Sequence, residues 1–457
     1  MKTPFKNNKK VRRAKQLLCQ AVQEAQRNIH ALREGDRRYK RSYQRMVDRM
    51  GRLRGRPLYF PYIGSGVGQG AFVALADGSV KYDFITGIGV HYLGHSHPKI
   101  LDAAIDAALE DIVMQGNLQL NAVSLEAADG LMKMACAKGE RLRHCFLTSS
   151  GAMANENAFK VIFQKKYPAS RLLAFKKCFA GRSLATGRMT DKPQDRQGLP
   201  KTVTIDYIPF YDPQKPKEST AKALQHLTHL LKRHRGQYAG MCLEMVQGEG
   251  GANAGSKKFF MALLRVLKKH RVAVMVDEIQ TFGRTSKPFA FQHFGLDQYV
   301  DVVTVGKMTQ FCATLFTPEF NPKPGLLSQT FTASTSALHA GKAILTEISQ
   351  GGYFGRTGKI ARFSQRFQHH LEKLAAEFPA LIKGPFGLGA MIGMTYADGS
   401  PQKTSQFVHK LYDNGVLSFS AGERPSRVRF LIPVGAVTMH DIDMVCGIIK
   451  KTVEELN

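Results

Sequence analysis

The sequence predicts an α/β fold with a mostly parallel central sheet and a smaller C-terminal α+β domain. Short apolar runs alternate with segments whose apolar residues recur at helical spacing. Two of these runs lead directly to a charged residue, Asp277 in one case and Lys307 in the other. From about Gly351 onward the alternation gives way to long helical segments around short strands, which indicates a second domain.

The expected sheet strands are six apolar runs, at residues 144–148, 172–175, 203–205, 241–243, 272–276 and 302–305. Three segments between them carry apolar residues at helical spacing, at 154–164, 219–232 and 256–270. Strands that alternate with helices in this way are typical of a mostly parallel sheet covered by helices.

The domain organisation follows from length and from the change of pattern near Gly351. At 457 residues the chain is too long for one compact core. Long helices are expected at 357–377, 405–414 and 439–455, with short strands near Met391 and Val428. We therefore expect a basic, mainly helical arm over 1–60, a large domain over 61–350 and a small domain over 351–457.

The net charge of +29 is unusual for an enzyme of this size. Residues 1–60 hold 18 basic and 4 acidic side chains, so nearly half of the excess lies there. A basic helix can bind nucleic acid or an anionic membrane surface. Because aromatic interleaving and a recognisable nucleic-acid motif are both missing, we favour a helix packed on the enzyme body or on a partner subunit. A transit peptide is a third possibility, since acidic residues are sparse.

The cysteines and the apolar stretches together favour a cytoplasmic protein. Seven scattered cysteines include no Cys-x-x-Cys pair, so neither a zinc site nor a disulfide framework is indicated. No apolar stretch reaches the roughly 18 to 20 residues of a membrane span. Leu17 and Leu18 lie among charged residues rather than in the apolar core of a signal peptide.

Asp277 and Lys307 carry the strongest chemical signal. Each follows a run expected to be a buried parallel strand, so both belong at the carboxyl edge of the sheet, where open α/β sheets bind ligands. A lysine that forms a Schiff base and an acid that pairs with a protonated pyridine nitrogen are what pyridoxal phosphate requires. Taken alone the pair has ordinary alternatives, because a strand-end Asp is often a helix cap and a strand-end Lys is usually solvated.

Five blocks, in order along the chain, resemble the class III (ω-) aminotransferases. They lie at 83–98, 148–156, 247–251, 277–285 and 305–307; the fourth reads Asp-Glu-Ile-Gln-Thr-Phe-Gly-Arg-Thr, one glycine short of the family signature. The resemblance runs from about Gly70 to the carboxyl terminus. It implies a fold-type I, pyridoxal-phosphate-dependent homodimer that transfers an amino group from a small-molecule amine donor to an oxo-acid acceptor.

The resemblance also implies catalytic roles for Lys307 and Asp277 and a set of cofactor-binding residues. That set is Ser150, Gly151, Ala152, Phe179, Asp277, Gln280, Lys307 and Thr330. Ser150 to Ala152 lie between a strand and a helix, where backbone N–H groups can cradle a phosphate, although an ordinary helix cap is the alternative. Phe179 stands where the family stacks a ring on the pyridine, or else is a core residue. Thr330 matches a threonine that reaches the cofactor phosphate of the neighbouring subunit.

Arg182, Glu249 and Arg429 are the substrate-binding residues that the resemblance implies. Guanidinium groups grip carboxylates through two parallel hydrogen bonds. Arg182 stands where relatives acting on α,ω-diamino acids bind the carboxylate far from the reacting amine. Arg429 stands where an arginine receives the α-carboxylate of glutamate or 2-oxoglutarate, and Glu249 where a glutamate neutralises that arginine. A surface ion pair is the alternative, and it is the interpretation we adopt for Arg427.

The expected donor is an ω-amine or a diamino acid of the lysine, ornithine, acetylornithine or 4-aminobutyrate type, with 2-oxoglutarate as acceptor. Residues 306–312 look closer to lysine 6-aminotransferases than to acetylornithine and ornithine enzymes, and Phe72 lacks a hydroxyl that ornithine-type enzymes often carry. Ala180 replaces a common histidine, and Thr-Ala-Ser at 332–334 replaces Gly-Gly-Asn. An aminomutase, a racemase, a decarboxylase and a non-catalytic basic binding protein on the same fold are the alternatives.

Overall fold

The computed structural model describes residues 7–116, 118–136 and 141–457. The chain divides into two compact units. Unit 1 comprises Met1–Leu109, Arg362–Pro385 and Ile392–Asn457, and unit 2 comprises Glu110–Ala361 and Phe386–Met391. This division groups the basic segment with the C-terminal residues, whereas the sequence-based expectation separated 1–60, 61–350 and 351–457.

Unit 2 is built on a seven-stranded sheet of order β5-β13-β12-β11-β8-β6-β7. Its strands are β5 (His144–Thr148), β6 (Arg171–Phe175), β7 (Thr204–Ile208), β8 (Tyr238–Leu243), β11 (Ala273–Asp277), β12 (Val302–Val305) and β13 (Cys312–Phe316). The pairings within β12-β11-β8-β6-β7 are parallel, whereas β13 runs antiparallel to both of its neighbours. The predicted mostly parallel α/β fold is therefore confirmed.

Strand β13 was not expected from the sequence. It turns back after Lys307 and inserts between β12 and β5, with Val305 opposite Ala313 and Thr148 opposite Cys312. All five of its residues are buried, which is typical of an interior strand covered on both faces. Its short apolar run directly follows the lysine motif, where no turn residue marks the start of a new strand.

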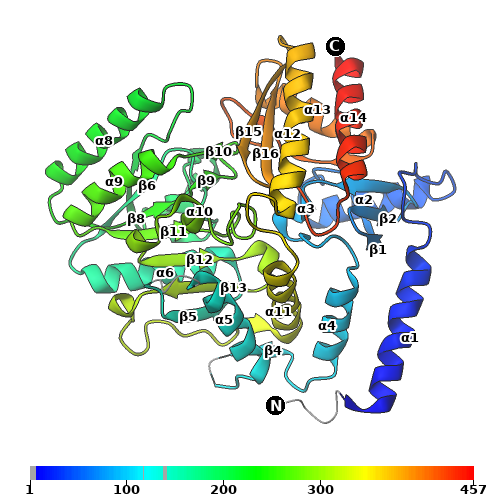
Figure 1. Cartoon of the computed structure of the whole chain (residues 1–457), viewed down its shortest axis with the longest axis horizontal. Coiled ribbons are helices and arrows are strands. Elements are labelled where there is room, and N and C mark those ends of the chain that lie inside the picture. Colours follow the sequence, from blue (N-terminus) through cyan, green and yellow to red (C-terminus); the bar gives the residue numbers. More distant parts are fainter. Residues whose placement is uncertain (1–6, 117, 137–140) are drawn as a thin grey trace. The chain divides into compact units, whose positions relative to one another are not determined.

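Helices cover both faces of this sheet. α8 (Pro216–Arg233) and α9 (Lys257–Lys269) lie on one side and α6 (Gly151–Lys166) on the other (Figure 1). The remaining elements of unit 2 are α5 (Ala122–Ala135), α7 (Leu184–Met189), α10 (Ala290–Phe294), α11 (Thr335–Gln350), β4 (Met114–Gln115), β9 (Val246–Gln247), β10 (Asn253–Ala254) and β14 (Ala333–Ser334). The apolar face of α9, with Phe259, Phe260, Leu263, Leu264 and Leu267, is fully buried, as helical spacing requires.

Two four-stranded sheets belong largely to unit 1. The first, of order β1-β2-β3-β17, contains β1 (Gly64–Gln69), β2 (Phe72–Leu75), β3 (Val80–Asp83) and β17 (Val416–Leu417). The second, of order β15-β16-β19-β18, contains β15 (Ile382–Leu388), β16 (Met391–Tyr396), β18 (Phe419–Ala421) and β19 (Arg427–Leu431). Because β17 pairs with β3, residues more than 300 positions apart share one sheet.

The helices in this part of the chain are α1 (Lys9–Gln26), α2 (Lys40–Leu53), α3 (Thr86–Gly89), α4 (Pro98–Ala108), α12 (Lys359–Glu377), α13 (Pro401–Asp413) and α14 (Met439–Leu456). α1 packs on its own unit, since Lys15 Nζ lies 2.8 Å from a carboxylate oxygen of both Asp102 and Asp106 on α4. The buried Gln26 side chain donates to the Gly68 carbonyl at 2.8 Å. In the part of the chain that the structure describes, no helix is long and apolar enough to cross a bilayer.

Candidate active site

Three ionisable side chains lie at the carboxyl edge of three neighbouring parallel strands. Asp277 ends β11, Glu244 directly follows β8, and Lys307 follows β12 after a single glycine. The strand order β12-β11-β8 makes these strand ends adjacent. Tertiary structure thus brings Asp277 and Lys307 to one edge, as their positions after apolar runs predicted.

Asp277 is buried and held by two hydrogen bonds. The Asn155 side-chain amide on α6 donates to Oδ2 at 2.8 Å, and the Ile279 backbone N–H donates to Oδ1 at 3.0 Å. Burial raises the pKa of Asp277, while these two donors and the positive charge of Lys307 act in the opposite direction. The carboxylate is therefore fixed in one orientation among groups that favour its ionised form.

Asn155 connects Asp277 to two other parts of the site. Its amide also donates to the Ala180 carbonyl at 2.7 Å, and its side-chain oxygen accepts from the Thr304 hydroxyl at 2.8 Å. This buried network orients the loop that carries Phe179 relative to the end of β11. Sequence reasoning missed the role of Asn155, because a helical asparagine gives no sign of which distant carboxylate it contacts.

Lys307 sits in a constrained turn at the end of β12. It adopts a φ of +56°, which is uncommon for a residue with a side chain, and it starts a short 3-10 turn of residues Lys307–Thr309. The preceding Gly306 is needed there, since a Cβ atom would come within 2.8 Å of Cys312 Sγ. The half-buried lysine is close enough for its charge to lower the pKa of both Asp277 and Glu244.

Glu244 is a second buried carboxyl group that sequence reasoning missed. It accepts the Phe179 backbone N–H at 2.8 Å and the Gly248 N–H at 3.4 Å. Burial, reinforced by the nearby charge of Asp277, raises the pKa of Glu244 to about 8. Its position directly after a buried strand, like that of Asp277, was the available signal.

The N-terminus of α6 fits an anion such as a phosphate. Ser150 is the N-cap, and its hydroxyl accepts the Met153 N–H at 3.2 Å, so the helix-cap interpretation is correct for this side chain. Among the described residues, no acceptor is found for the backbone N–H groups of Gly151 and Ala152. These two donors and the helix dipole leave a place for a negative group beside the cap.

Phe179 and Arg182 lie together on the loop after β6. The Phe179 ring is half-buried, and the Arg182 guanidinium lies 5.9 Å from the ring centroid. Arg182 also pairs with Asp195 at 3.1 Å, while 65% of its side chain stays exposed. The arginine is therefore accessible to a ligand carboxylate next to an aromatic plate.

Glu249 forms an ion pair that the sequence did not suggest. Its Oε1 atom lies 2.7 Å from Lys192 Nζ, and each side chain keeps less than a quarter of its surface exposed. Residues next to Lys192 are tied to the Phe179 loop, since the Thr190 hydroxyl accepts the Ala180 N–H at 3.0 Å and donates to the Gly181 carbonyl at 2.9 Å. The pair is therefore anchored to the same loop as the aromatic plate.

The other predicted site residues occupy different environments. Gln280 is buried, and its side-chain oxygen lies against Gly248, where a Cβ atom would come within 1.9 Å of it. Thr330 is exposed, with its carbonyl against Gly116. Arg429 is fully buried on β19 in unit 1.

Arg427 corrects one expectation from the sequence. We interpreted it as a surface residue in an ion pair, yet it is 9% exposed and lies on β19. Burial lowers the pKa of Arg427 to about 10. Arg427 and Val428 are neighbours on a strand and point to opposite faces, so the sequence suggested that the arginine faces solvent. Both faces of this strand are covered, and Arg427 is therefore buried.

The geometry can be compared with known proteins. The aminotransferase class-III family model matches residues 62–453. The chain belongs to the class III aminotransferases. This aminotransferase is 30% identical over 398 residues to the acetylornithine aminotransferase of Bacillus subtilis (strain 168), with 84% of this chain and 93% of that protein covered. It is 28% identical over 396 residues to the [LysW]-aminoadipate semialdehyde transaminase of Deinococcus radiodurans, with 85% and 86% covered.

Solved structures show the same fold at low sequence identity. The aminotransferase matches the lysine aminotransferase from M. tuberculosis with a TM-score of 0.79 and 23% identity, covering 90% of this chain and 100% of that one. It matches the ornithine aminotransferase from Toxoplasma gondii ME49 with a TM-score of 0.77 and 21% identity, covering 90% and 94%. The expectations of a fold-type I enzyme and of pyridoxal phosphate as cofactor are confirmed, and the alternative of a non-catalytic binding protein is set aside. Among the described residues, no group of three His, Cys, Asp or Glu side chains is arranged to hold a metal ion.

Proposed function

We propose that the enzyme transfers an amino group from an ω-amine or diamino acid, of the lysine, ornithine, acetylornithine or 4-aminobutyrate type, to 2-oxoglutarate. The observation that carries this proposal is Arg182, an accessible guanidinium beside the Phe179 ring. A diamino acid has a carboxylate far from its terminal amine, and an arginine beside the cofactor plate would hold that carboxylate while the amine reacts. The transaminases among its relatives support the same reaction class.

The residues of the site fit pyridoxal phosphate. The N–H groups of Gly151 and Ala152 would hold its phosphate, Phe179 would support its ring and Asp277 would bind the ring nitrogen. When bound, the cofactor supplies an electron sink for the negative charge that develops on the reacting carbon. Asp277 would keep the ring nitrogen protonated, because Asn155 and the Ile279 N–H favour the ionised carboxylate. Lys307 would hold the cofactor, and its amine would be placed to move a proton at the reacting carbon of the donor.

Two substrates of different charge require an adjustable site. We assign Arg429 to the α-carboxylate of the acceptor and Glu249 to the neutralisation of that arginine during the donor reaction. Lys192 gives Glu249 another partner, since the two side chains are 2.7 Å apart. Glu249 paired with Lys192 would leave Arg429 to a dicarboxylate acceptor, whereas Glu249 released from Lys192 would shield the arginine.

The assembly and the compartment complete the proposal. We assign Thr330 to the cofactor phosphate of the neighbouring subunit, which makes the working enzyme a homodimer; its side chain is exposed in the single chain. None of the seven cysteines, all of which lie within the described residues, forms a disulfide, which suits a reducing cytoplasm.

A visible absorption spectrum tests the donor class. Purified enzyme with bound cofactor is titrated with candidate amines in the absence of acceptor. We expect loss of the absorbance band of the lysine-bound cofactor with ω-amines that carry a distal carboxylate, and its return on addition of 2-oxoglutarate. A band that responds only to monoamines, or that 2-oxoglutarate does not restore, contradicts the proposal. A decarboxylase or racemase would instead turn over the amine without consuming an acceptor.

A further inference from the structure

The solvent-facing side of helix α2 carries an unusual row of arginines. Arg41, Arg45, Arg49 and Arg52 follow one another at intervals of four, four and three residues, which places them on one helical face. All four side chains are exposed. Within the described part of the chain, the side chains of these four arginines form no hydrogen bond or ion pair. Their positive charge is therefore directed to solvent.

The opposite face of α2 fixes the helix to its unit. Tyr43 is buried, and its hydroxyl donates to the Pro61 carbonyl at 2.6 Å and accepts the Ile63 N–H at 3.0 Å. Gly51 is also buried, and a Cβ atom there would already touch Pro57 at 3.4 Å. The arginine row is thus presented by an ordered helix rather than by a loose tail.

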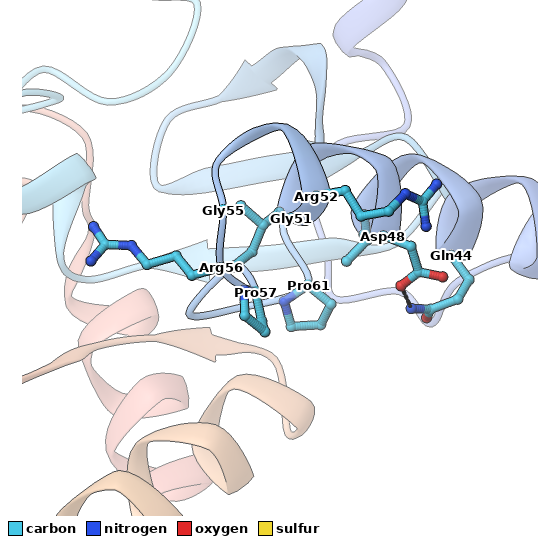
Figure 2. A pocket seen from close by; sticks show the side chains of 10 residues that line it. Gln44, Asp48, Gly51, Arg52, Gly55, Arg56, Pro57 and Pro61 are labelled. Atoms are coloured by element: carbon cyan, nitrogen blue, oxygen red, sulfur yellow. Dashed lines mark hydrogen bonds between the residues drawn. The ribbon is translucent and has the colours of Figure 1, made fainter.

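Charge continues beyond the helix and around a pocket at its end. Residues 37–56 contain nine basic residues, eight of them arginine, and a single acidic residue, Asp48. A pocket of about 720 Å³ lies between α2 and the loop that follows it. Figure 2 shows Arg52 on the helix and Arg56 on the loop extending to opposite sides of this pocket, while Gln44 donates to Asp48 at 2.8 Å. The single acidic side chain of residues 37–56 is thus hydrogen-bonded to a neighbouring amide.

The family relationship does not account for this surface. The class III family model begins at residue 62, so α2 precedes the segment that this model matches. The proposed site residues of unit 2 lie at position 150 or beyond. The arginine row therefore lies outside both the segment that the family model matches and the proposed site residues of unit 2.

We propose that the outer face of α2 is a docking surface for the phosphate backbone of nucleic acid. Residues four apart on a helix advance about 6 Å along its axis, so Arg41, Arg45 and Arg49 form an evenly spaced track for successive phosphates. Guanidinium groups bind phosphate oxygens in pairs and lose less hydration than ammonium groups do, which explains the predominance of arginine over lysine. Each neutralised phosphate releases counterions, and this release drives binding at low salt.

An anionic membrane is the weaker match to the same charge. A helix that lies in a membrane interface inserts a continuous apolar face that includes large aromatic or aliphatic side chains. The two buried residues of α2, Tyr43 and Gly51, face the protein. Met46, Met50 and Leu53 are the exposed apolar residues of the helix, and they include no aromatic side chain.

The test compares two variants of the full-length holoenzyme that lose equal charge. One carries Arg41→Gln, Arg45→Gln, Arg49→Gln and Arg52→Gln. The matched control carries Lys217→Gln, Lys222→Gln, Lys232→Gln and Arg233→Gln, which are exposed residues of α8. Fluorescence anisotropy with a labelled oligonucleotide, single-stranded or double-stranded, measures affinity between about 50 and 200 mM salt. In the α2 variant we expect the affinity to fall at least about tenfold and the slope of log K against log salt concentration to become shallower by about 3 units. The α8 variant should bind like the wild type.

Other outcomes overturn the proposal. Equal losses in both variants indicate diffuse charge rather than a surface on α2. Binding of the wild type to phosphatidylserine vesicles but not to oligonucleotides, lost in the α2 variant, assigns the surface to membranes. A change in oligomeric state in the α2 variant assigns it to a second copy of the chain. Cofactor absorbance checks the fold, and if the fourfold variant misfolds, Arg45→Gln with Arg49→Gln should give about half the change in salt slope.

Discussion

At the scale of single residues, the site depends on two neighbouring buried carboxyl groups with different partners. Asp277 receives a side-chain amide and a backbone N–H, whereas Glu244 receives two backbone N–H groups and lies near the charge of Asp277. Two adjacent carboxyl groups in a buried site resist simultaneous ionisation. We therefore expect Asp277 to carry the charge that faces the cofactor and Glu244 to hold a proton near neutral pH.

Lys307 is expected to be indispensable. Lys307→Ala removes the amine that holds the cofactor, so both turnover and the absorbance band of the lysine-bound cofactor should disappear. Lys258→Ala, at an exposed position on α9, serves as the control and should leave both unchanged. A Lys307→Ala protein that kept the band and full transamination would exclude the assignment.

Glu244 is expected to make stability depend on pH. Its pKa of about 8 in the folded protein exceeds the ordinary value of 4.5, so the folded state keeps a proton that the unfolded chain loses between these values. The free energy of unfolding therefore falls as pH rises through that window. Glu244→Gln removes this titration. The Tm of the variant minus that of the wild type should therefore increase by roughly 5 °C as pH rises from about 5 to about 8.

Differential scanning fluorimetry of both proteins across this pH range makes the comparison. Glu278, whose pKa burial raises to about 7, is present in both proteins and cancels in the difference. Parallel Tm curves for wild type and Glu244→Gln would show that Glu244 does not titrate there.

Lys192 is expected to affect one half-reaction more than the other. Lys192→Met leaves Glu249 without its 2.7 Å partner, so the glutamate competes more strongly with the acceptor for Arg429. A charge-assisted hydrogen bond contributes about 1.5 to 3 kcal/mol, so the half-reaction with 2-oxoglutarate should weaken roughly 10- to 150-fold. Stopped-flow absorbance measures each half-reaction separately, and Lys192→Arg should restore the acceptor step. Equal losses with donor and acceptor would count against this role.

At the scale of secondary-structure elements, α1 and α2 differ in how they contact the rest of unit 1. α1 contributes Lys15, paired with Asp102 and Asp106, and the buried amide of Gln26. α2 is anchored on one face and charged on the other. The packing that we favoured from the sequence therefore describes α1, while the outer face of α2 remains available to a partner.

Deleting residues 1 to 26 should separate these roles. The deletion removes α1 and its contacts with α4 and β1, so we expect Tm to fall by roughly 2 to 8 °C. Cofactor absorbance and oligonucleotide binding should persist, because the proposed site and α2 are both retained. Calorimetry, the visible spectrum and anisotropy measure the three properties on one preparation. Loss of the cofactor band would show that α1 supports the site.

At the scale of the whole molecule, the proposed homodimer makes each site depend on two chains. If Thr330 contacts the cofactor phosphate of the neighbouring subunit, Thr330→Ala should weaken cofactor binding by roughly 1 to 2 kcal/mol, about 5- to 30-fold. Mixed dimers of Thr330→Ala and Lys307→Ala chains would then contain one site with both native residues. Within these mixed dimers, half of the sites should regain the wild-type cofactor affinity. Affinity that stays at the Thr330→Ala value would place Thr330 in its own subunit's site or outside any site.

Local patterns in the sequence determined much of the catalytic unit. Six strands of the central sheet and three of the helices between them follow from apolar runs and helical spacing, because a strand buried on both faces must be apolar throughout. The positions of Asp277 and Lys307 at strand ends follow from the same runs. The family signature added the cofactor, since its motifs occur in a fixed order.

Tertiary structure alone decided which distant residues touch. Asn155 and Asp277 are 122 positions apart, and Lys192 and Glu249 are 57 apart, so their contacts depend on the order of strands in the sheet. No local pattern encodes that order, and for this reason β13, the burial of Arg427 and the role of Glu244 were missed. The sequence shows a highly charged N-terminal segment, but only the packing of Tyr43 and Gly51 decides which arginines of α2 face solvent. The type of an element depends on neighbours along the chain, whereas its contacts depend on neighbours in space.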